Sequence, residues 1–197
     1  MQITSQMVKE LRDKTNAGMM DCKKALAETG GESEKAIDLL RQKGLAVARK
    51  RANRTTSEGM IETYIHADGK IGVMVEVGCE TDFVAKNSEF RIFAKNVAIH
   101  IAAANPIAIK PEEVPKDVLE RERNIFRQQG LDSGKPANIV EKMLDGKTAK
   151  FYAEVCLMGQ KYVKNPDLSV QDLLNELIAK LGENISVKRF ARFQIGA

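Results

Sequence analysis

The chain contains 197 residues, of which 43% are hydrophobic and 29% are charged, and its formal net charge is +4. This length allows one substantial domain with a small one beside it, and so mild a charge does not demand a nucleic-acid partner. No run of 18 apolar residues is present, and charged residues occupy the amino terminus where a secretory signal would need an apolar core. We therefore expect a cytoplasmic protein with no membrane partner.

Apolar spacing predicts three short helices at the start of the chain. The first is ended by Ala17–Gly18, the second covers residues 19–28, and the third runs from Ser33 to Gly44. Three helices of this length make a small bundle with a thin core.

A basic segment follows these helices. It has two interpretations, a contact with RNA phosphates or a solvated linker helix. No aromatic residue interleaves with the charges to stack on bases, so we favour the linker, and steering toward an acidic protein surface stays open. Its six basic residues, with no acidic residue between them, are Arg41, Lys43, Arg49, Lys50, Arg51 and Arg54.

A β-hairpin is predicted from Met60 to Cys79, with Asp68–Gly69 as a two-residue loop. Its strands alternate apolar residues, and one face of the second strand carries Ile71, Val73, Val75 and Val77. A long helix should start at Asn87 or Ser88, bury Phe90 and Phe93, and end at Asn105–Pro106.

The second half of the chain reads as mostly helical after Pro111. The predicted helices are a highly charged one over residues 117–129, one from Pro136 to Gly146, one over residues 147–160, and, after a break at Asn165–Pro166, one capped by Ser169 and Asp172 and stopped by Gly182. The last prediction is a strand interrupted at Arg189, whose alternating apolar residues are Ile185, Val187, Ala191, Phe193 and Ile195. If this strand joins the hairpin, the sheet has three antiparallel strands and the fold class is α+β.

Three cysteines and two histidines are the remaining candidates for chemistry. Cys22, Cys79 and Cys156 are far apart and odd in number, so we expect reduced, buried thiols and neither a disulfide framework nor a zinc site. His66 and His100 have no nearby partner that suggests a metal or a catalytic pair, and we interpret both as structural. We expect no cofactor.

The stretch Thr81-Asp82-Phe83-Val84-Ala85-Lys86-Asn87 directly follows the hairpin. In one interpretation Thr81 caps a helix, Asp82 lies in its first turn and Phe83 packs in the core. In the other, the acid repels an anion or competes for its metal, while the aromatic ring enters a partner.

A second motif lies near the amino terminus, over residues 11–26 with the sequence LRDKTNAGMMDCKKAL. Together the two motifs resemble the signatures of the bacterial elongation factor Ts family, which exchanges nucleotide on elongation factor Tu. Asn16 stands where we expect the family's glycine, and both residue types tolerate left-handed backbone. The resemblance is continuous from Ile3 to about Asn105 and looser beyond.

The resemblance implies a fold and a partner. Residues 1–54 should form a three-helix domain like a ubiquitin-associated domain, without implying ubiquitin binding, and residues 55–197 an α+β core that mediates dimerisation. The partner should be elongation factor Tu, and the short members of the family imply a homodimer.

The resemblance also implies roles for single residues. Asp82 and Phe83 should enter elongation factor Tu beside its Mg²⁺ site and release GDP, with Thr81 shaping the turn and Val84 backing it. Met19 and Met20 should grip the nucleotide-binding domain, although packing inside the bundle is the alternative for them, and we expect at least one of the two to be buried.

No catalytic constellation appears in the sequence. There is no GxxxxGK[ST] phosphate loop and no Ser/His/Asp or Cys/His arrangement, so we expect a protein that acts by binding and is not an enzyme. Two alternatives stay open: a basic RNA- or ribosome-binding protein, whose binding should weaken steeply with salt, and covalent catalysis through Cys79.

Overall fold

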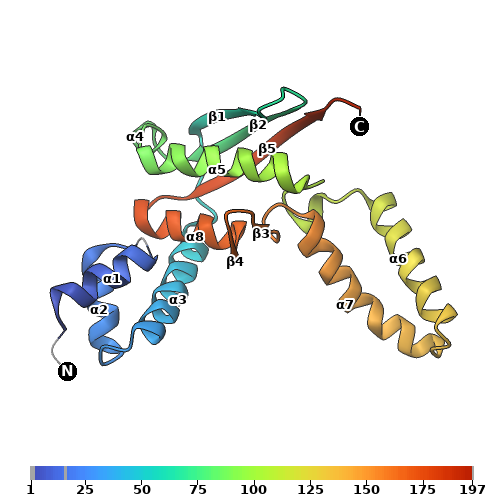
Figure 1. Cartoon of the computed structure of the whole chain (residues 1–197), viewed down its shortest axis with the longest axis horizontal. Helices are drawn as coiled ribbons and strands as arrows, with labels where there is room; N and C mark the ends of the chain where they lie inside the picture. Colours follow the sequence, from blue (N-terminus) through green and yellow to red (C-terminus); the bar gives the residue numbers. More distant parts are fainter. Residues whose placement is uncertain (1–2, 16, 197) are drawn as a thin grey trace. The chain divides into compact units, whose positions relative to one another are not determined.

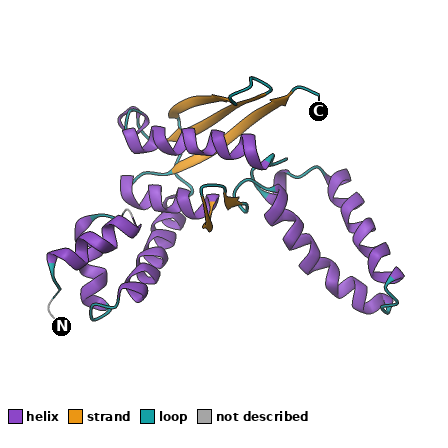
Figure 2. Ribbon diagram, in the orientation of Figure 1, coloured by secondary structure: helices purple, strands orange, loops and turns teal. Residues whose placement is uncertain are grey.

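The computed structural model describes residues 3–15 and 17–196, so the turn expected at Asn16 lies outside the described residues. Helices with a small antiparallel sheet confirm the α+β class (Figures 1 and 2). The helices are α1 (Ser5–Thr15), α2 (Met19–Glu28), α3 (Ser33–Arg51), α4 (Asp82–Ala85), α5 (Ser88–Ala104), the 3-10 helix η1 (Pro111–Glu113), α6 (Lys116–Asp132), α7 (Ala137–Val155) and α8 (Val170–Leu181). The strands are β1 (Glu58–Ile65), β2 (Ile71–Cys79), β3 (Lys161–Tyr162), β4 (Asn165–Ser169) and β5 (Ile185–Gln194).

The chain forms two compact units, and each unit gathers segments that are distant in sequence. The first contains the described residues of Met1–Glu62 together with Val75–Asn96 and Asp172–Lys188. The second contains Thr63–Met74, Val97–Gln171 and the described residues of Arg189–Ala197. The separation of residues 1–54 from residues 55–197 stays a prediction.

Helices α1, α2 and α3 share an apolar core in the first unit. Short apolar side chains fill much of it, which lets the three helices approach closely. Its buried members are Val8, Leu11, Cys22, Ala25, Leu26 and Ala36.

The prediction that the third helix ends at Gly44 is wrong, because α3 continues to Arg51. Gly44 is buried, and a β-carbon built there would lie 3.7 Å from the β-carbon of Ala179 on α8. Glycine costs a helix only about 1 kcal/mol relative to alanine, and close packing at this position outweighs that preference. The basic segment is therefore largely helical, as its linker-helix interpretation expected.

The hairpin forms, but its loop is longer than two residues. The Gly69 N–H donates to the His66 carbonyl oxygen at 2.7 Å, and the His66 N–H donates to the Ile71 carbonyl oxygen at 2.9 Å. The loop between this last pair is therefore residues 67–70. Gly69 takes the left-handed conformation, with φ of +72°, which closes such a turn at no steric cost.

The three-stranded sheet has the order β1-β2-β5, which confirms the predicted pairing of the terminal strand with the hairpin. Val73, Val75 and Val77 of β2 are buried, as their alternation predicts.

The alternating apolar residues of β5 do not share one buried face. Ile185 and Val187 are buried, whereas Phe193 is 72% exposed. Arg192 instead turns toward α5, where its guanidinium donates to the Ala102 carbonyl oxygen at 3.1 Å. The alternation thus shifts by one residue at Lys188–Arg189, the position of the predicted interruption, and such a shift moves every later side chain to the opposite face.

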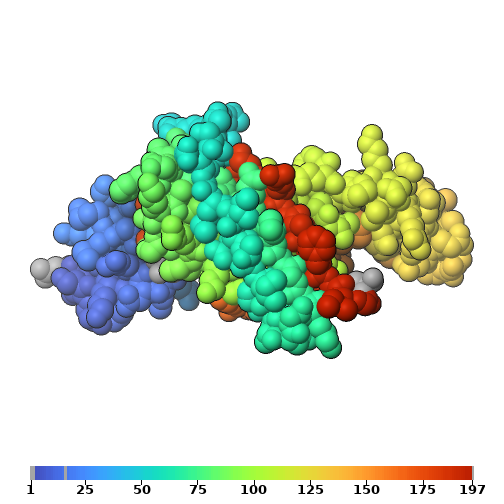
Figure 3. Space-filling model, turned by 90° about the horizontal axis from the view of Figure 1, so that it is seen from above, coloured from blue at the N-terminus to red at the C-terminus, as the bar shows by residue number. Residues whose placement is uncertain are grey.

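The shift leaves an apolar surface on the second unit, which we call the outer sheet face. In Figure 3 the tip of the hairpin and the end of β5, in red, lie at the surface of this view. A β-carbon on Gly72 would lie 3.2 Å from Cδ1 of Ile65, so neighbouring strands meet there. The outer sheet face consists of Ile65, Met74, Phe193 and Ile195.

Helices α6 and α7 form an antiparallel helical hairpin in the second unit. The charged helix predicted over residues 117–129 is confirmed as part of α6. The predicted break near Gly146 is wrong, because α7 runs without interruption from Ala137 to Val155. The break predicted at Asn165–Pro166 is confirmed, because these residues lie between α7 and α8, where they begin β4, which pairs with β3. A proline at the first positions of a short edge strand removes little hydrogen bonding.

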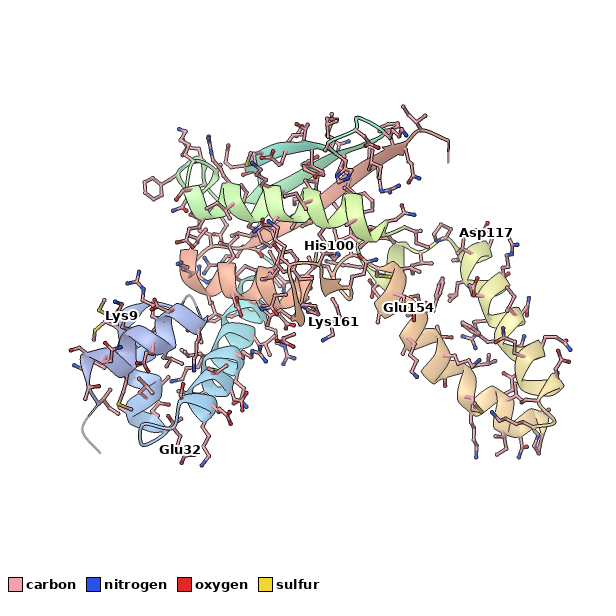
Figure 4. All side chains as sticks on the ribbon, in the orientation of Figure 1. Lys9, Glu32, His100, Asp117, Glu154 and Lys161 are labelled. Atoms are coloured by element: carbon pink, nitrogen blue, oxygen red, sulfur yellow. The ribbon has the colours of Figure 1, made fainter. Side chains whose placement is uncertain are left out.

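Gln160 joins two helices of the second unit to buried His100. Its amide nitrogen donates to the Glu154 carbonyl oxygen at 2.7 Å and to that of Ala104 at 3.3 Å, while its amide oxygen lies 3.0 Å from Nε2 of His100. Figure 4 labels His100 on α5 and Glu154 near the end of α7. The Val163 N–H donates to Nδ1 of His100, so the proton of the neutral ring belongs on Nε2. His100 is therefore structural, as predicted.

The His100 network should make folding stability depend on pH. Burial lowers the pKa of His100 below its usual value near 6.5, because a buried charge is poorly solvated. At acid pH the unfolded chain then binds more protons than the folded one. The stability that neutral His100 contributes is therefore fully present above about pH 6.5 and is lost as the pH falls through the folded-state pKa. We expect the free energy of unfolding, measured with urea between pH 5 and 8, to decline on the acid side. The decline should be smaller in His100→Gln, whereas His66→Gln, at an exposed position, should retain it. Identical pH profiles for wild type and His100→Gln would contradict this assignment.

Candidate functional site

The stretch from Thr81 to Asn87 links the end of β2 to the start of α5. Thr81 is the N-cap of α4, and its hydroxyl oxygen accepts from the Val84 N–H at 3.4 Å. The Asn87 side-chain oxygen accepts from the Glu89 N–H at 2.8 Å and opens α5. Two local caps therefore place a single helical turn between the strand and the long helix.

Within this turn the side chains divide sharply between the core and the solvent. Phe83 is 78% exposed, whereas Val84 and Ala85 are buried. The alternative in which Phe83 packs in the core is therefore wrong, and Phe90 and Phe93 are the buried aromatics, as expected. Val84 backs the turn from inside, so its side chain is not available to a partner in this conformation.

Asp82 carries a negative charge next to the exposed ring. Its carboxylate pairs with the Lys86 ammonium one turn later at 2.7 Å, and both side chains are largely exposed. The hydrogen bond and charge of Lys86 lower the pKa of Asp82. Asp82 is thus an anionic hydrogen-bond acceptor at neutral pH, and water screens its ion pair.

Glu183 and Asn184 hold the residues before the turn, and sequence reasoning missed both. The Glu183 carboxylate accepts from the Thr81 N–H at 3.0 Å and from the Thr81 hydroxyl at 2.7 Å. The Glu80 carboxylate accepts from the Asn184 N–H at 2.6 Å, which lowers the pKa of Glu80. No local signal marks these partners, because about a hundred residues separate them from the motif.

Met19 and Met20 lie at the start of α2, on a different element of the same unit. They are 59% and 62% exposed, so the expectation that at least one of them is buried is wrong. The face of α2 that packs in the core of the bundle carries Cys22, Ala25 and Leu26. Met19 and Met20 do not belong to this buried face. Both thioether side chains are therefore free to contact an irregular apolar surface.

All three cysteines are buried and reduced, as predicted. Burial raises the pKa of the Cys79 thiol to about 11, and burial also raises the pKa values of Cys22 and Cys156. A buried thiol with so high a pKa is a poor nucleophile at neutral pH, which disfavours covalent catalysis through Cys79. Among the described residues, no group of three or more His, Cys, Asp or Glu side chains is arranged to hold a metal ion.

Part of the basic segment is neutralised within the first unit. Lys43 pairs with Glu28 at 2.7 Å and Arg54 with Glu80 at 3.3 Å. Two of the six basic residues therefore have an acidic partner within the first unit. Across the part of the chain that the structure describes, no helix is both long enough and apolar enough to cross a membrane.

Comparison with known proteins decides the family. The model of a family described as Elongation factor TS matches residues 1–197. The chain belongs to the elongation factor Ts family. Elongation factor Ts of Desulfotalea psychrophila is 72% identical over 197 residues and is covered completely, as is this chain. Elongation factor Ts of Carboxydothermus hydrogenoformans is 60% identical over 194 residues, covering 98% of this chain and 89% of the relative, and that of Geobacter sp. strain M21 is 59% identical over 196 residues, covering 100% and 91%.

Proposed function

We propose that this protein is the guanine-nucleotide exchange factor for elongation factor Tu and acts in the cytoplasm during translation elongation. The observation that carries the proposal is the exposed Asp82–Phe83 pair, which projects from a short turn with buried backing in a member of the elongation factor Ts family. Such a factor needs no catalytic group, because it changes only how tightly the GTPase holds its nucleotide.

The physical basis is reciprocal binding. A partner that binds the nucleotide-free GTPase more tightly must weaken nucleotide binding by the same factor. A hundredfold weakening requires about 2.7 kcal/mol of differential binding. Burial of one phenylalanine side chain contributes about 1.5–3 kcal/mol, so the ring of Phe83 with a few further contacts is sufficient.

The residues of the turn take separate roles in this proposal. Phe83 inserts beside the Mg²⁺ site of elongation factor Tu, and Asp82 acts on the metal and phosphate region, once it has left Lys86. Thr81 shapes the turn and Val84 supports it from the core. Met19 and Met20 dock on the nucleotide-binding domain as part of residues 1–54.

The decisive measurement is the release of a fluorescent GDP analogue from elongation factor Tu. Release should accelerate at concentrations of this protein far below that of the GTPase, because one molecule serves many turnovers. A protein that merely sequestered the GTPase would act stoichiometrically, and an unchanged release rate across the titration would refute the proposal. If acceleration persists when the salt concentration is raised severalfold, phosphate-driven RNA binding does not account for the activity.

We also propose that residues 55–197 form a homodimer through the outer sheet face. The residues of the outer sheet face, Ile65, Met74, Phe193 and Ile195, are all exposed, and β1 and β5 are edge strands. Apolar side chains beside open edges are typical of surfaces covered by association, and a two-fold interface would use each residue twice.

Charge reversal of this surface should separate the copies. Phe193→Asp would bury two carboxylates in a two-fold interface, so we expect sedimentation at micromolar concentration to change from a dimer to a monomer. Ile139→Asp, which adds the same charge at an exposed position of α7, should leave the mass unchanged. A monomeric wild type under the same conditions would contradict dimerisation.

A further inference from the structure

The turn that carries Phe83 is too short to be stable by its local hydrogen bonds alone. Helix α4 spans only the four residues Asp82–Ala85, and an isolated turn of helix is unstable because nucleation fixes several dihedral angles for one hydrogen bond. Its N-cap bond, from the Val84 N–H to the Thr81 hydroxyl, is long at 3.4 Å. The orientation of the exposed ring must therefore depend on contacts from outside the turn.

Glu183 supplies two of these contacts, in addition to the burial of Val84 and Ala85. Its two carboxylate oxygens each accept one bond from Thr81, at 3.0 Å from the backbone N–H and at 2.7 Å from the hydroxyl. This pairing fixes both the backbone and the side chain of the residue that precedes Asp82. Since the Thr81 hydroxyl donates to Glu183, its lone pairs are oriented toward the Val84 N–H, and the carboxylate polarises the cap.

Asn184 fastens the same loop to two further segments. Its backbone N–H donates to Glu80 at 2.6 Å, and its buried side-chain amide donates to the Arg54 carbonyl oxygen at 2.7 Å. Arg54 completes the arrangement by pairing with Glu80 at 3.3 Å. The loop between α8 and β5 thus connects the residues after α3 to the residues before α4.

We propose that Glu183, supported by Asn184, is a positioning residue for nucleotide exchange that holds Thr81 and so presets the orientation of Phe83. This inference rests on the proposed exchange function. Glu183 acts through Thr81 and needs no contact with elongation factor Tu. Its effect is to keep the turn in the binding-competent conformation before the partner arrives, which removes the cost of ordering it during exchange.

A carboxylate at position 183 is better suited to hold Thr81 than the side chain of glutamine or alanine. Two donors of one residue point at Glu183, and only a carboxylate offers an acceptor oxygen to each. Glutamine keeps one acceptor and turns an NH₂ group toward the second donor, so Glu183→Gln should weaken the contact partially. Glu183→Ala should abolish it.

The first arm of the test needs no partner. The chain contains no tryptophan, so Phe83→Trp places a single indole at the tip of the turn, and time-resolved anisotropy reports its nanosecond motion. Adding Glu183→Ala should increase the amplitude of the fast depolarisation, and Glu183→Gln should give an intermediate value. Unchanged anisotropy in the Glu183→Ala background would overturn the proposal.

The second arm measures GDP release from elongation factor Tu with phenylalanine retained at position 83. Loss of two hydrogen bonds to a charged acceptor at this partly exposed site should lower the maximal release rate about fivefold in Glu183→Ala and about twofold in Glu183→Gln. The concentration for half-maximal release should change less, because the remaining docking contacts persist. Glu141→Ala, which removes an exposed carboxylate paired with Arg127 on the α6–α7 hairpin, should match the wild type.

Substitutions at Thr81 show whether Glu183 acts through that residue. Thr81→Ser keeps the hydroxyl and should retain activity, whereas Thr81→Val removes it at nearly constant volume and should lower the maximal rate. In a double-mutant cycle of Thr81→Val and Glu183→Ala, the combined loss should be smaller than the product of the single losses. Fully independent losses would overturn the proposal, as would increased motion of the probe with unchanged exchange.

The two arms separate this inference from the function on which it rests. If wild type fails to release GDP while the anisotropy still responds to Glu183→Ala, the exchange function fails and the contact is structural alone. If wild type is active and Glu183→Ala is equally active, the exchange function stands and the positioning role fails. Thermal melting of every variant identifies any loss of activity that comes from unfolding.

Discussion

Phe83→Ala is expected to lower the maximal rate of GDP release from elongation factor Tu by about tenfold to a hundredfold, which is the binding contribution of one buried phenylalanine ring. The free energy of unfolding should change little, since the side chain is 78% exposed and surface substitutions usually alter stability by less than about 0.5 kcal/mol. Parallel urea unfolding and exchange assays measure the two effects separately.

Phe90→Ala is the matched control for this variant. Phe90 lies seven residues later on α5 and is completely buried, so its truncation should cost about 3–5 kcal/mol of folding free energy. The two substitutions remove the same atoms from opposite environments. If Phe83→Ala destabilises the protein as much as Phe90→Ala does, the ring is not the inserted group. Full exchange activity in a stable Phe83→Ala protein would contradict its role directly.

Gly59→Ala is expected to destabilise the first unit by about 3 kcal/mol or more, because no small adjustment can accommodate the added methyl group. Gly59 has a φ of +148°, and a β-carbon there would lie 2.2 Å from the Val77 carbonyl oxygen and 2.8 Å from Cα of Gly78. Both obstacles are backbone atoms of β2, so the two strands must separate. Urea unfolding measures the loss.

Gly69→Ala provides the comparison. Gly69 also has a positive φ, of +72°, but a β-carbon there meets no atom within 4 Å. Only the conformational penalty remains, which is about 1–2 kcal/mol for a left-handed residue. The difference between the two variants combines the close approach at the β1–β2 contact with the less accessible φ of Gly59. Equal losses would show that close approach at Gly59 does not control the sheet.

Local sequence patterns were sufficient wherever neighbouring residues decide the structure. Asn105–Pro106 ends α5, the alternating valines of β2 are buried, and Thr81 and Asn87 cap the helices that follow them. Each of these features depends on side-chain periodicity or on a hydrogen bond within a few residues.

Long-range packing decided the features that the sequence did not reveal. Gly44 and Gly146 look like helix ends, yet α3 and α7 pass through them, since tertiary contacts outweigh a propensity difference of about 1 kcal/mol. In β5 the alternation of buried and exposed side chains shifts by one residue, depending on which elements pack against each part of the strand. A periodic sequence pattern does not contain that information.

The candidate site divides in the same way. The motif from Thr81 to Asn87 is visible in the sequence. The sequence left two alternatives for the Phe83 ring, packing in the core or contact with a partner. The residue that holds the motif, Glu183, is 102 residues away from Thr81, next to an ordinary helix stop at Gly182. A single glutamate after a helix carries no signal of so distant a contact.

The burial of all three thiols has a practical consequence for following this protein by fluorescence. Cys22, Cys79 and Cys156 are at most 1% exposed, and maleimide dyes react with accessible thiolates. A cysteine introduced at an exposed position, such as Asp68 in the hairpin loop, should therefore be labelled selectively in the native state. Dye-labelled protein for single-molecule measurements can then be prepared with every native cysteine in place.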